Sequence, residues 1–124
     1  MHHRVRYQTE PGVYVPAYLL LPKGLDPDKR ALGLLCLHGH GHFEKDSVAG
    51  IDNTFERKAE IDKHSYNFGQ KFSEAGYVVL TPDLRGLGER PPGYPHPGTD
   101  YCSRNYMCAT LLGTTVVALH LCDL

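Results

Sequence analysis

The sequence of 124 residues contains no apolar run that approaches the roughly 20 residues needed to span a bilayer. The residues after Met1 form no apolar stretch of the kind found in signal peptides. Lysine and arginine are scattered and the formal net charge is −1, which argues against a nucleic acid or an anionic membrane as partner. These absences predict a single globular domain in the cytoplasm that binds neither nucleic acid nor membrane.

The sequence also lacks any Cys-X-X-Cys pair, and its four cysteines are too sparse for a small secreted disulfide scaffold. Cys36 lies in an apolar run, where a cysteine behaves as a small hydrophobe. The composition therefore predicts reduced thiols, with a Cys102–Cys108 bridge as the open alternative. Catalysis by a cysteine would need a base histidine beside it, which spacing along the chain cannot reveal.

The most informative segment is the apolar run Leu34–Leu37, which ends abruptly in His38-Gly39-His40-Gly41-His42. An uninterrupted apolar run predicts a strand that is buried on both faces, as in the middle of a parallel sheet. Alternate glycines let the backbone turn sharply and let a ligand approach it closely. Open α/β sheets bind ligands at such loops, at the carboxyl ends of their strands. A tight turn whose glycines only relieve crowding is the competing interpretation.

The rest of the chain alternates between strand and helix signals, and Pro16 favours a sheet edge because proline cannot donate to a ladder. In chain order, the expected elements are an edge strand at Val13–Leu21, a buried strand at Ala31–Leu37, a long loop at Gly39–Lys63, a helix at His64–Ala75, a buried strand at Tyr77–Thr81, an irregular segment at Pro82–Arg104 and a helix at Asn105–Leu124 broken at Gly113. This order predicts an α/β fold with a mostly parallel sheet and flanking helices.

A second strand runs into alternating glycines at Thr81–Arg90. Asp83 and Arg85 could pair with each other or with backbone groups and so fix this loop. No reaction requires the order Asp-X-Arg-Gly, so a structural role is the favoured interpretation. The proline-rich segment Pro91–Gly98 is interpreted as a stiff surface loop.

Several segments, taken together and in this order, resemble the α/β-hydrolase superfamily. Pro11–Pro22 resembles the N-terminal strands of its esterases, His38–Gly41 their oxyanion loop, Gly76–Arg90 the next strand and turn, and Leu111–Leu124 the helix before the nucleophile strand. The resemblance is closest to the acetyl xylan esterase and dienelactone hydrolase-like branch. It covers essentially the whole chain but only the first part of the family's fold.

The resemblance implies a serine hydrolase of carboxylic esters with small acyl groups, acting without cofactor or metal. The backbone N–H of His40 would donate to the oxyanion, within an oxyanion loop that includes Gly39 and Gly41. His38 would be a structural residue at the strand end, and Asp83–Gly88 would support the cleft. The substrate of the complete enzyme would be a small-molecule ester.

The chain lacks the family's nucleophile elbow, Gly-X-Ser-X-Gly, after which the acid and the base histidine follow in chain order. Glycines do not flank any serine at that spacing; the serines are Ser47, Ser65, Ser73 and Ser103. We therefore expect residues 1–124 to be the N-terminal part of one α/β-hydrolase domain, truncated before the nucleophile elbow and inactive alone. The outer strand would expose an unpaired edge, suited to self-association or to a complementing C-terminal chain.

Two other classes of function stay open. In the first, a metal-dependent hydrolase or metal-binding module uses the alternating histidines, because His-X-His after a strand can ligate zinc. The candidate ligands are His38, His40 and His42, continued by Glu44 and Asp46, with His64, His96 and His120 further along the chain. In the second, the chain is a non-catalytic domain that assembles with a partner through its sheet edge.

Overall fold

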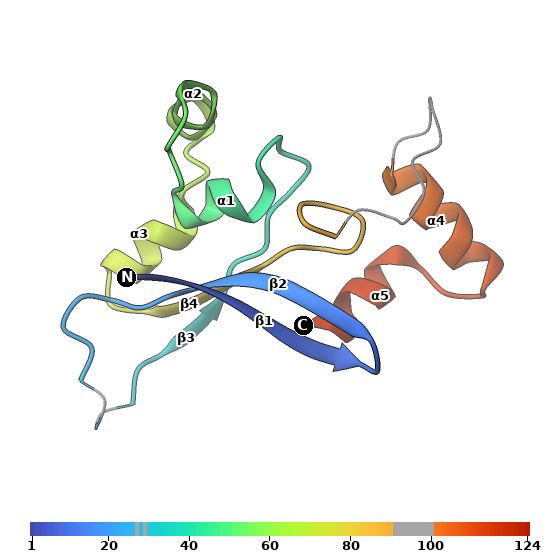
Figure 1. The fold of residues 1–124 in the computed structure, drawn as a ribbon, viewed down its shortest axis with the longest axis horizontal. Coiled ribbons are helices and arrows are strands. Elements are labelled where there is room, and N and C mark those ends of the chain that lie inside the picture. Colours follow the sequence, from blue (N-terminus) through green and yellow to red (C-terminus); the bar gives the residue numbers. More distant parts are fainter. Residues whose placement is uncertain (27, 29, 91–100) are drawn as a thin grey trace.

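The computed structural model describes residues 1–26, 28, 30–90 and 101–124 (Figure 1). Within these residues the elements are β1 (His2–Glu10), β2 (Val13–Leu20), β3 (Gly33–Leu35), α1 (Glu44–Ala49), α2 (Phe55–His64), α3 (Phe68–Glu74), β4 (Val78–Pro82), α4 (Tyr101–Leu111) and α5 (Val116–Asp123). A sheet with helices packed around it confirms the α/β class predicted from the alternation of strand and helix signals.

The four strands of this sheet lie in the order β1-β2-β4-β3. β1 and β2 are antiparallel, β2 and β4 are antiparallel, and only β3 and β4 are parallel. The sheet in the described residues is therefore mixed, and the expectation of a mostly parallel sheet is wrong for them. One antiparallel pair is the hairpin that β1 and β2 form through the Pro11-Gly12 turn, where Gly12 has φ 80°, and the other arises because β4 pairs with β2 of this hairpin.

β1 has no counterpart among the elements expected from the sequence, although it is nine residues long. Its half-buried side chains are Val5, Tyr7 and Thr9, which alternate with exposed residues. β-branched and aromatic residues with a period of two are typical of a half-buried strand. The alternation typical of a strand was thus present in the sequence of β1, but few of its residues are strongly apolar.

β2 lies inside the sheet and not at its edge, which corrects the expectation based on Pro16. Pro16 lies at the very end of the β2–β4 pairing, where its carbonyl accepts a hydrogen bond from the Asp83 N–H at 2.9 Å. The N–H that proline lacks would have reached the Asp83 carbonyl, and Arg90 Nη1 donates to that carbonyl instead, at 3.2 Å. An interior proline is tolerated here because a side chain replaces the missing donor.

One face of the sheet carries the main core, which consists of Leu20, Cys36, Val48, Ala49 and Val79. Val48 and Ala49 come from α1, and α1 and α3 pack over β2 and β4 on this face (Figure 1). On the opposite face, Tyr7 and Thr9 hydrogen-bond Asp123 at the end of α5. The sheet therefore has helical residues against both faces.

β3 is paired on one side only in the described residues, and its regular pairing covers Gly33–Leu35, a shorter strand than the expected Ala31–Leu37. Cys36 extends the pairing by donating to the Leu80 carbonyl at 2.9 Å. Leu35 and Leu37 are 44% and 38% exposed, whereas Cys36 is buried. The expectation of a strand buried on both faces is thus wrong here, because neither helix nor strand among the described residues covers the side of Leu35 and Leu37.

The expected long loop at Gly39–Lys63 is also wrong, since α1 and most of α2 lie within it. Thr54 caps α2 by accepting a hydrogen bond from the Arg57 N–H at 3.2 Å. α3 confirms a helix in the expected range His64–Ala75 but begins later, at Phe68. Short, polar helices of this kind lack the apolar periodicity on which the sequence analysis relied.

The C-terminal region confirms a helix interrupted at Gly113, with α4 beginning at Tyr101 and α5 capped by the hydroxyl of Thr115. Among the described helices none is alone long and apolar enough to cross a membrane, and α4 and α5 reach that length and composition only as a pair bent by 96°. The segment Pro91–Gly98 lies outside the described residues.

Candidate functional site

The loops that follow β3 and β4 lie together at the carboxyl ends of this parallel pair. We call them the first glycine loop (residues 38–42) and the second glycine loop (residues 83–90). His38 joins them: its Nε2 accepts a hydrogen bond from the Leu84 N–H at 3.1 Å, and its Nδ1 lies 2.8 Å from the Gly39 carbonyl. His38 is therefore a bridge between the loops, as a structural residue at the strand end should be.

The contacts of His38 define a neutral ring. Nδ1 must carry the proton, because it faces a carbonyl, and Nε2 must accept, because it faces an N–H. Burial lowers the pKa of His38 below its ordinary value of 6.5, against the hydrogen bond to Gly39 and the nearby Asp83 carboxylate. The side chain is thus held as a neutral bridge and is not available as a base.

The glycines of the first loop are not required by the local backbone. Neither Gly39 nor Gly41 has a positive φ. A Cβ on Gly39 would meet no described atom within 4 Å, and one on Gly41 would only touch the Tyr66 ring at 3.5 Å. The His40 N–H makes no hydrogen bond to any described residue. The missing side chains therefore leave one stretch of backbone open to a ligand.

A small pocket of about 50 Å³ adjoins this open backbone. Gly39 and Gly41 form part of its wall, and Val48 and Phe68 form its apolar part. The hydroxyl of Ser47 is buried in the same wall and has no hydrogen-bond partner among the described residues. This arrangement places an apolar niche and one hydroxyl beside the oxyanion loop expected from the sequence.

The second glycine loop is built around the buried carboxylate of Asp83. Asp83 Oδ2 accepts from Lys45 Nζ at 2.6 Å and from the Glu89 N–H at 2.9 Å. Lys45 Nζ also donates to Glu89 Oε1 at 2.6 Å, and Arg4 binds the other oxygen of Glu89. Burial alone would lower the pKa of Lys45, but the two carboxylates raise it. Lys45 is therefore held charged inside the protein.

Arg85 and Asp83 do not pair with each other, which settles a point that the sequence left open. Arg85 Nε lies 2.7 Å from Asp123 Oδ2, and its Nη2 lies 2.8 Å from Glu10. Arg90 Nη1 reaches the same oxygen of Asp123 at 2.7 Å. Burial raises the pKa of Asp123, but the two arginines outweigh it and hold that pKa below the ordinary value. Asp83 and Arg85 both fix the second loop, as expected of supporting residues.

Glu44, which the sequence pattern indicated only as a metal ligand, lies between the two glycine loops. It lines the small pocket and is the first residue of α1, yet its φ is 40°. Burial raises the pKa of its carboxyl group, and the negative charges of Asp83 and Asp46 add to this. A non-glycine residue with a positive φ is uncommon and costs conformational energy. No pattern in the sequence could have revealed it, because the strain depends on the turn into α1.

The imidazole of His40 points toward the start of α4. Its Nε2 lies 2.8 Å from Cys102 Sγ. The structure thus places a histidine beside a cysteine, which sequence spacing could not show. The described cysteines form no disulfide in this structure, Cys102 and Cys108 included.

The alternating histidines do not gather around a common centre. Among the described residues no group of three histidine, cysteine, aspartate or glutamate side chains is placed to hold a metal ion. Both ring nitrogens of His38 are engaged, and His40 faces Cys102. His96 lies outside the described residues. The geometry thus gives the metal hypothesis no support.

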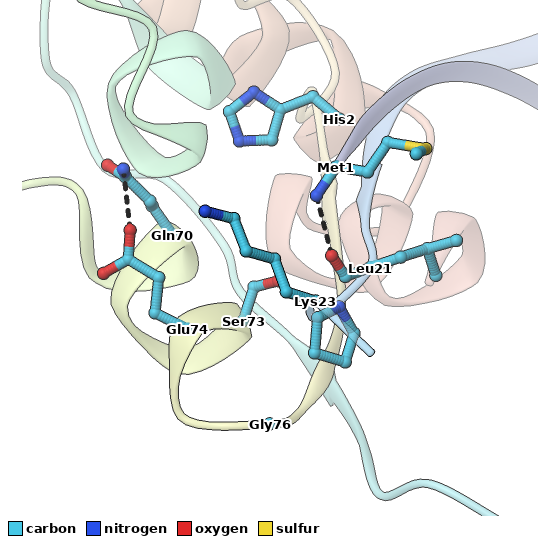
Figure 2. A pocket seen from close by; sticks show the side chains of 9 residues that line it. Met1, His2, Leu21, Lys23, Gln70, Ser73, Glu74 and Gly76 are labelled. Carbon is cyan, nitrogen blue, oxygen red and sulfur yellow. Dashed lines mark hydrogen bonds between the residues drawn. The ribbon is translucent and has the colours of Figure 1, made fainter. Parts of the chain in front are cut away.

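Another pocket, of about 480 Å³, lies between the start of β1 and α3 (Figure 2). It adjoins Gly76, before the start of β4, and so lies at the opposite end of the parallel pair from the glycine loops. Two of its polar groups bond to their neighbours: the Met1 ammonium donates to the Leu21 carbonyl at 2.8 Å, and Gln70 donates to Glu74 at 3.0 Å.

A scan against protein-family models found no match, and a search of curated proteins found no similar sequence. The function of this chain must therefore be inferred from its own residues and their geometry.

Proposed function

We propose that residues 1–124 are the N-terminal part of an α/β-hydrolase domain that hydrolyses carboxylic esters with small acyl groups. The chain contributes the oxyanion loop, in which the His40 N–H is one donor and Gly39 and Gly41 leave it accessible. The serine nucleophile, its acid and its base histidine belong to a part of the domain that this sequence does not contain.

The observation that carries the proposal is the steric freedom of the first glycine loop. Gly39 and Gly41 adopt no positive φ and have room for a methyl group, so the fold itself does not require glycine at either place. A ligand that must reach the backbone N–H does require it, because a side chain would obstruct the approach. Oxyanion holes use such exposed N–H groups, and the loss of one donor typically costs about 2.7–4 kcal/mol of barrier.

The small pocket beside the loop supports the short acyl group. Its volume is about 50 Å³. So small a space suits a group of the size of acetyl better than a long acyl chain. Val48 and Phe68 supply an apolar wall for a methyl group.

The sheet supports the placement within an α/β-hydrolase domain. The hairpin β1–β2 and the parallel pair β4–β3 make an arrangement with which such a sheet can begin, and the free side of β3 can take another parallel strand. The exposed Leu35 and Leu37 would gain cover from the elements that follow. The unpaired edge of β3 could also bind a partner chain. In this proposal that partner is a C-terminal chain that completes the domain.

The test is a chimera in which residues 1–124 replace the corresponding segment of an acetyl xylan esterase-like hydrolase. We expect it to hydrolyse p-nitrophenyl acetate and to form one serine adduct with a fluorophosphonate. Gly39→Val should lower the turnover number by about 10²–10³-fold, as the loss of an oxyanion donor does.

Gly33→Val is the matched control, because Gly33 also lacks a positive φ and a Cβ there would lie 3.9 Å from the Val78 carbonyl. It should leave turnover within about twofold of the parent, since β3 does not touch the reacting atoms. Equal effects of the two variants would contradict the proposal. So would a fluorophosphonate adduct on any serine of the isolated chain.

A further inference from the structure

The pair formed by Cys102 and His40 has no role in the proposed serine chemistry. Cys102 Sγ lies 2.8 Å from His40 Nε2, although the two residues are 62 positions apart in the sequence. Cys102 is partly exposed in the first turn of α4, and His40 is exposed in the first glycine loop. A nucleophile and a base within hydrogen-bond reach are the diagnostic geometry of an activated nucleophile.

The other cysteines have a different setting. Cys36 is buried in the core, and burial raises the pKa of its thiol. Cys108 and Cys122 are exposed, and no described histidine makes a hydrogen bond to either of them. Cys108 lies on α4 like Cys102 and therefore serves as an internal reference for an ordinary thiol.

We propose that Cys102 is a nucleophile that takes an acyl group from an activated ester, with His40 as its base. The thiol proton moves to His40 Nε2 while Sγ forms a bond to the carbonyl carbon. The carbon–oxygen bond to the alcohol then breaks, and the departing oxygen takes the proton from His40. The products are an S-acyl thioester on Cys102 and a free alcohol or phenol, so no oxidant or reductant is needed.

One feature favours an acyl group over other electrophiles. The histidine that faces the thiol also carries the open backbone N–H of the first glycine loop, which can stabilise an oxyanion near the same place. The inference uses the same loop as the proposed function but does not rest on it, since no serine takes part.

The experiment treats the whole chain with p-nitrophenyl acetate at pH 7 and at pH 9.5. Intact mass and peptide mapping locate the acetyl group and give the rate at each cysteine. We expect one acetyl group on Cys102 and none at comparable times on Cys108. His40→Asn, which keeps the backbone N–H and changes an exposed side chain, should slow acetylation of Cys102 by roughly 10²-fold at pH 7, within the usual range for a general base. The loss should shrink at pH 9.5, where a cysteine ionises without help.

His42→Asn is the matched control, because His42 is a second exposed histidine of the first glycine loop, whereas the histidine beside Cys102 Sγ is His40. It should leave the rate within about twofold. Cys102→Ser should abolish the adduct. The proposal is overturned if Cys102 reacts no faster than Cys108, or if His40→Asn and His42→Asn have equal effects at pH 7. An acetyl group on a serine would instead contradict the proposed function, so the two failures are distinguishable.

Discussion

The two glycine loops share a sequence pattern but differ in backbone conformation and in the space beside their glycines. Each follows a strand of the parallel pair, and each has glycines at alternate positions, Gly39 and Gly41 in one and Gly86 and Gly88 in the other. In the second loop both glycines have positive φ, at 78° and 58°. In the first loop neither does.

The surroundings differ in the same sense. A Cβ on Gly86 would overlap the side chain of Asn105, and one on Gly88 would overlap the carboxylate of Asp83. The corresponding space beside Gly39 is open. The conformation and packing of the second loop therefore require its glycines. In the first loop the glycines instead leave backbone N–H groups exposed. Because the second loop is rigid and charged, it can hold the first in place through His38.

The largest expected effect comes from removing the charge at the centre of the second loop. Lys45→Met leaves the buried Asp83 carboxylate without its cation, which should destabilise the protein by about 3–5 kcal/mol. Urea denaturation followed by circular dichroism measures the change. Lys58→Met is the control, since Lys58 is 61% exposed in its pair with Asp62 and should change stability by less than about 1 kcal/mol. A similar small change for both would show that the second loop is not held by its charges.

Gly88→Ala should be the next most damaging substitution. It combines a positive φ of 58° with an overlap on Asp83, and strain of this kind costs on the order of 1–3 kcal/mol. The loss should appear in the midpoint of thermal unfolding. Gly88→Asn separates the two causes. Asparagine tolerates the left-handed conformation, so any loss of stability in this variant reports the overlap with Asp83. If Gly88→Ala were as stable as the parent, the second loop would not require glycine at this position, and the two loops would not differ in this respect.

The link between the loops should make stability depend on pH. Folding lowers the pKa of His38, so at mildly acidic pH the unfolded chain binds more protons than the folded one. Stability should therefore be full above the ordinary value of 6.5 and fall as the pH drops below it. The slope for one proton is at most about 1.4 kcal/mol per pH unit. His2, whose pKa is also lowered, should account for the slope that remains in His38→Asn. An unchanged slope in that variant would contradict the assignment.

Gly39→Ala should have the smallest effect on stability and is the counterpart of Gly88→Ala. The methyl group has room and the backbone is unstrained, so the variant should be unchanged or more stable by about 0.4–1 kcal/mol. Urea denaturation of the two alanine variants side by side measures the difference. A loss at Gly39 as large as that at Gly88 would mean that the first loop also needs its glycines to fold.

The sequence was sufficient where its signals are local. The apolar run at Tyr77–Thr81 predicted β4, and Gly113 predicted the break between α4 and α5. It was insufficient where an outcome depends on a distant partner. Pro16 is interior because Arg90, far along the chain, supplies the missing donor, and no local pattern encodes that replacement.

The candidate site shows the same division. The first glycine loop was singled out by the glycines that alternate with histidines after a strand, a pattern that left a functional and a steric role equally open. The contact between His40 and Cys102 and the strained backbone of Glu44 were not found, since both arise only when separate segments meet. Whether Gly39 and Gly41 merely relieve crowding depends on their φ angles and on the space around a Cβ at each position. The sequence contains neither quantity.

The contacts of Asp123 have a consequence for the order in which the chain folds. Tyr7 and Thr9 bind Asp123 across 116 and 114 positions of sequence. During synthesis the β1–β2 hairpin therefore leaves the ribosome long before the residue that fastens it is made. Contacts so distant in sequence close slowly, because the entropy of a large loop is lost first. Until then the nascent hairpin lacks its contacts with Asp123. A chaperone that shields it during this interval would raise the yield of folded protein.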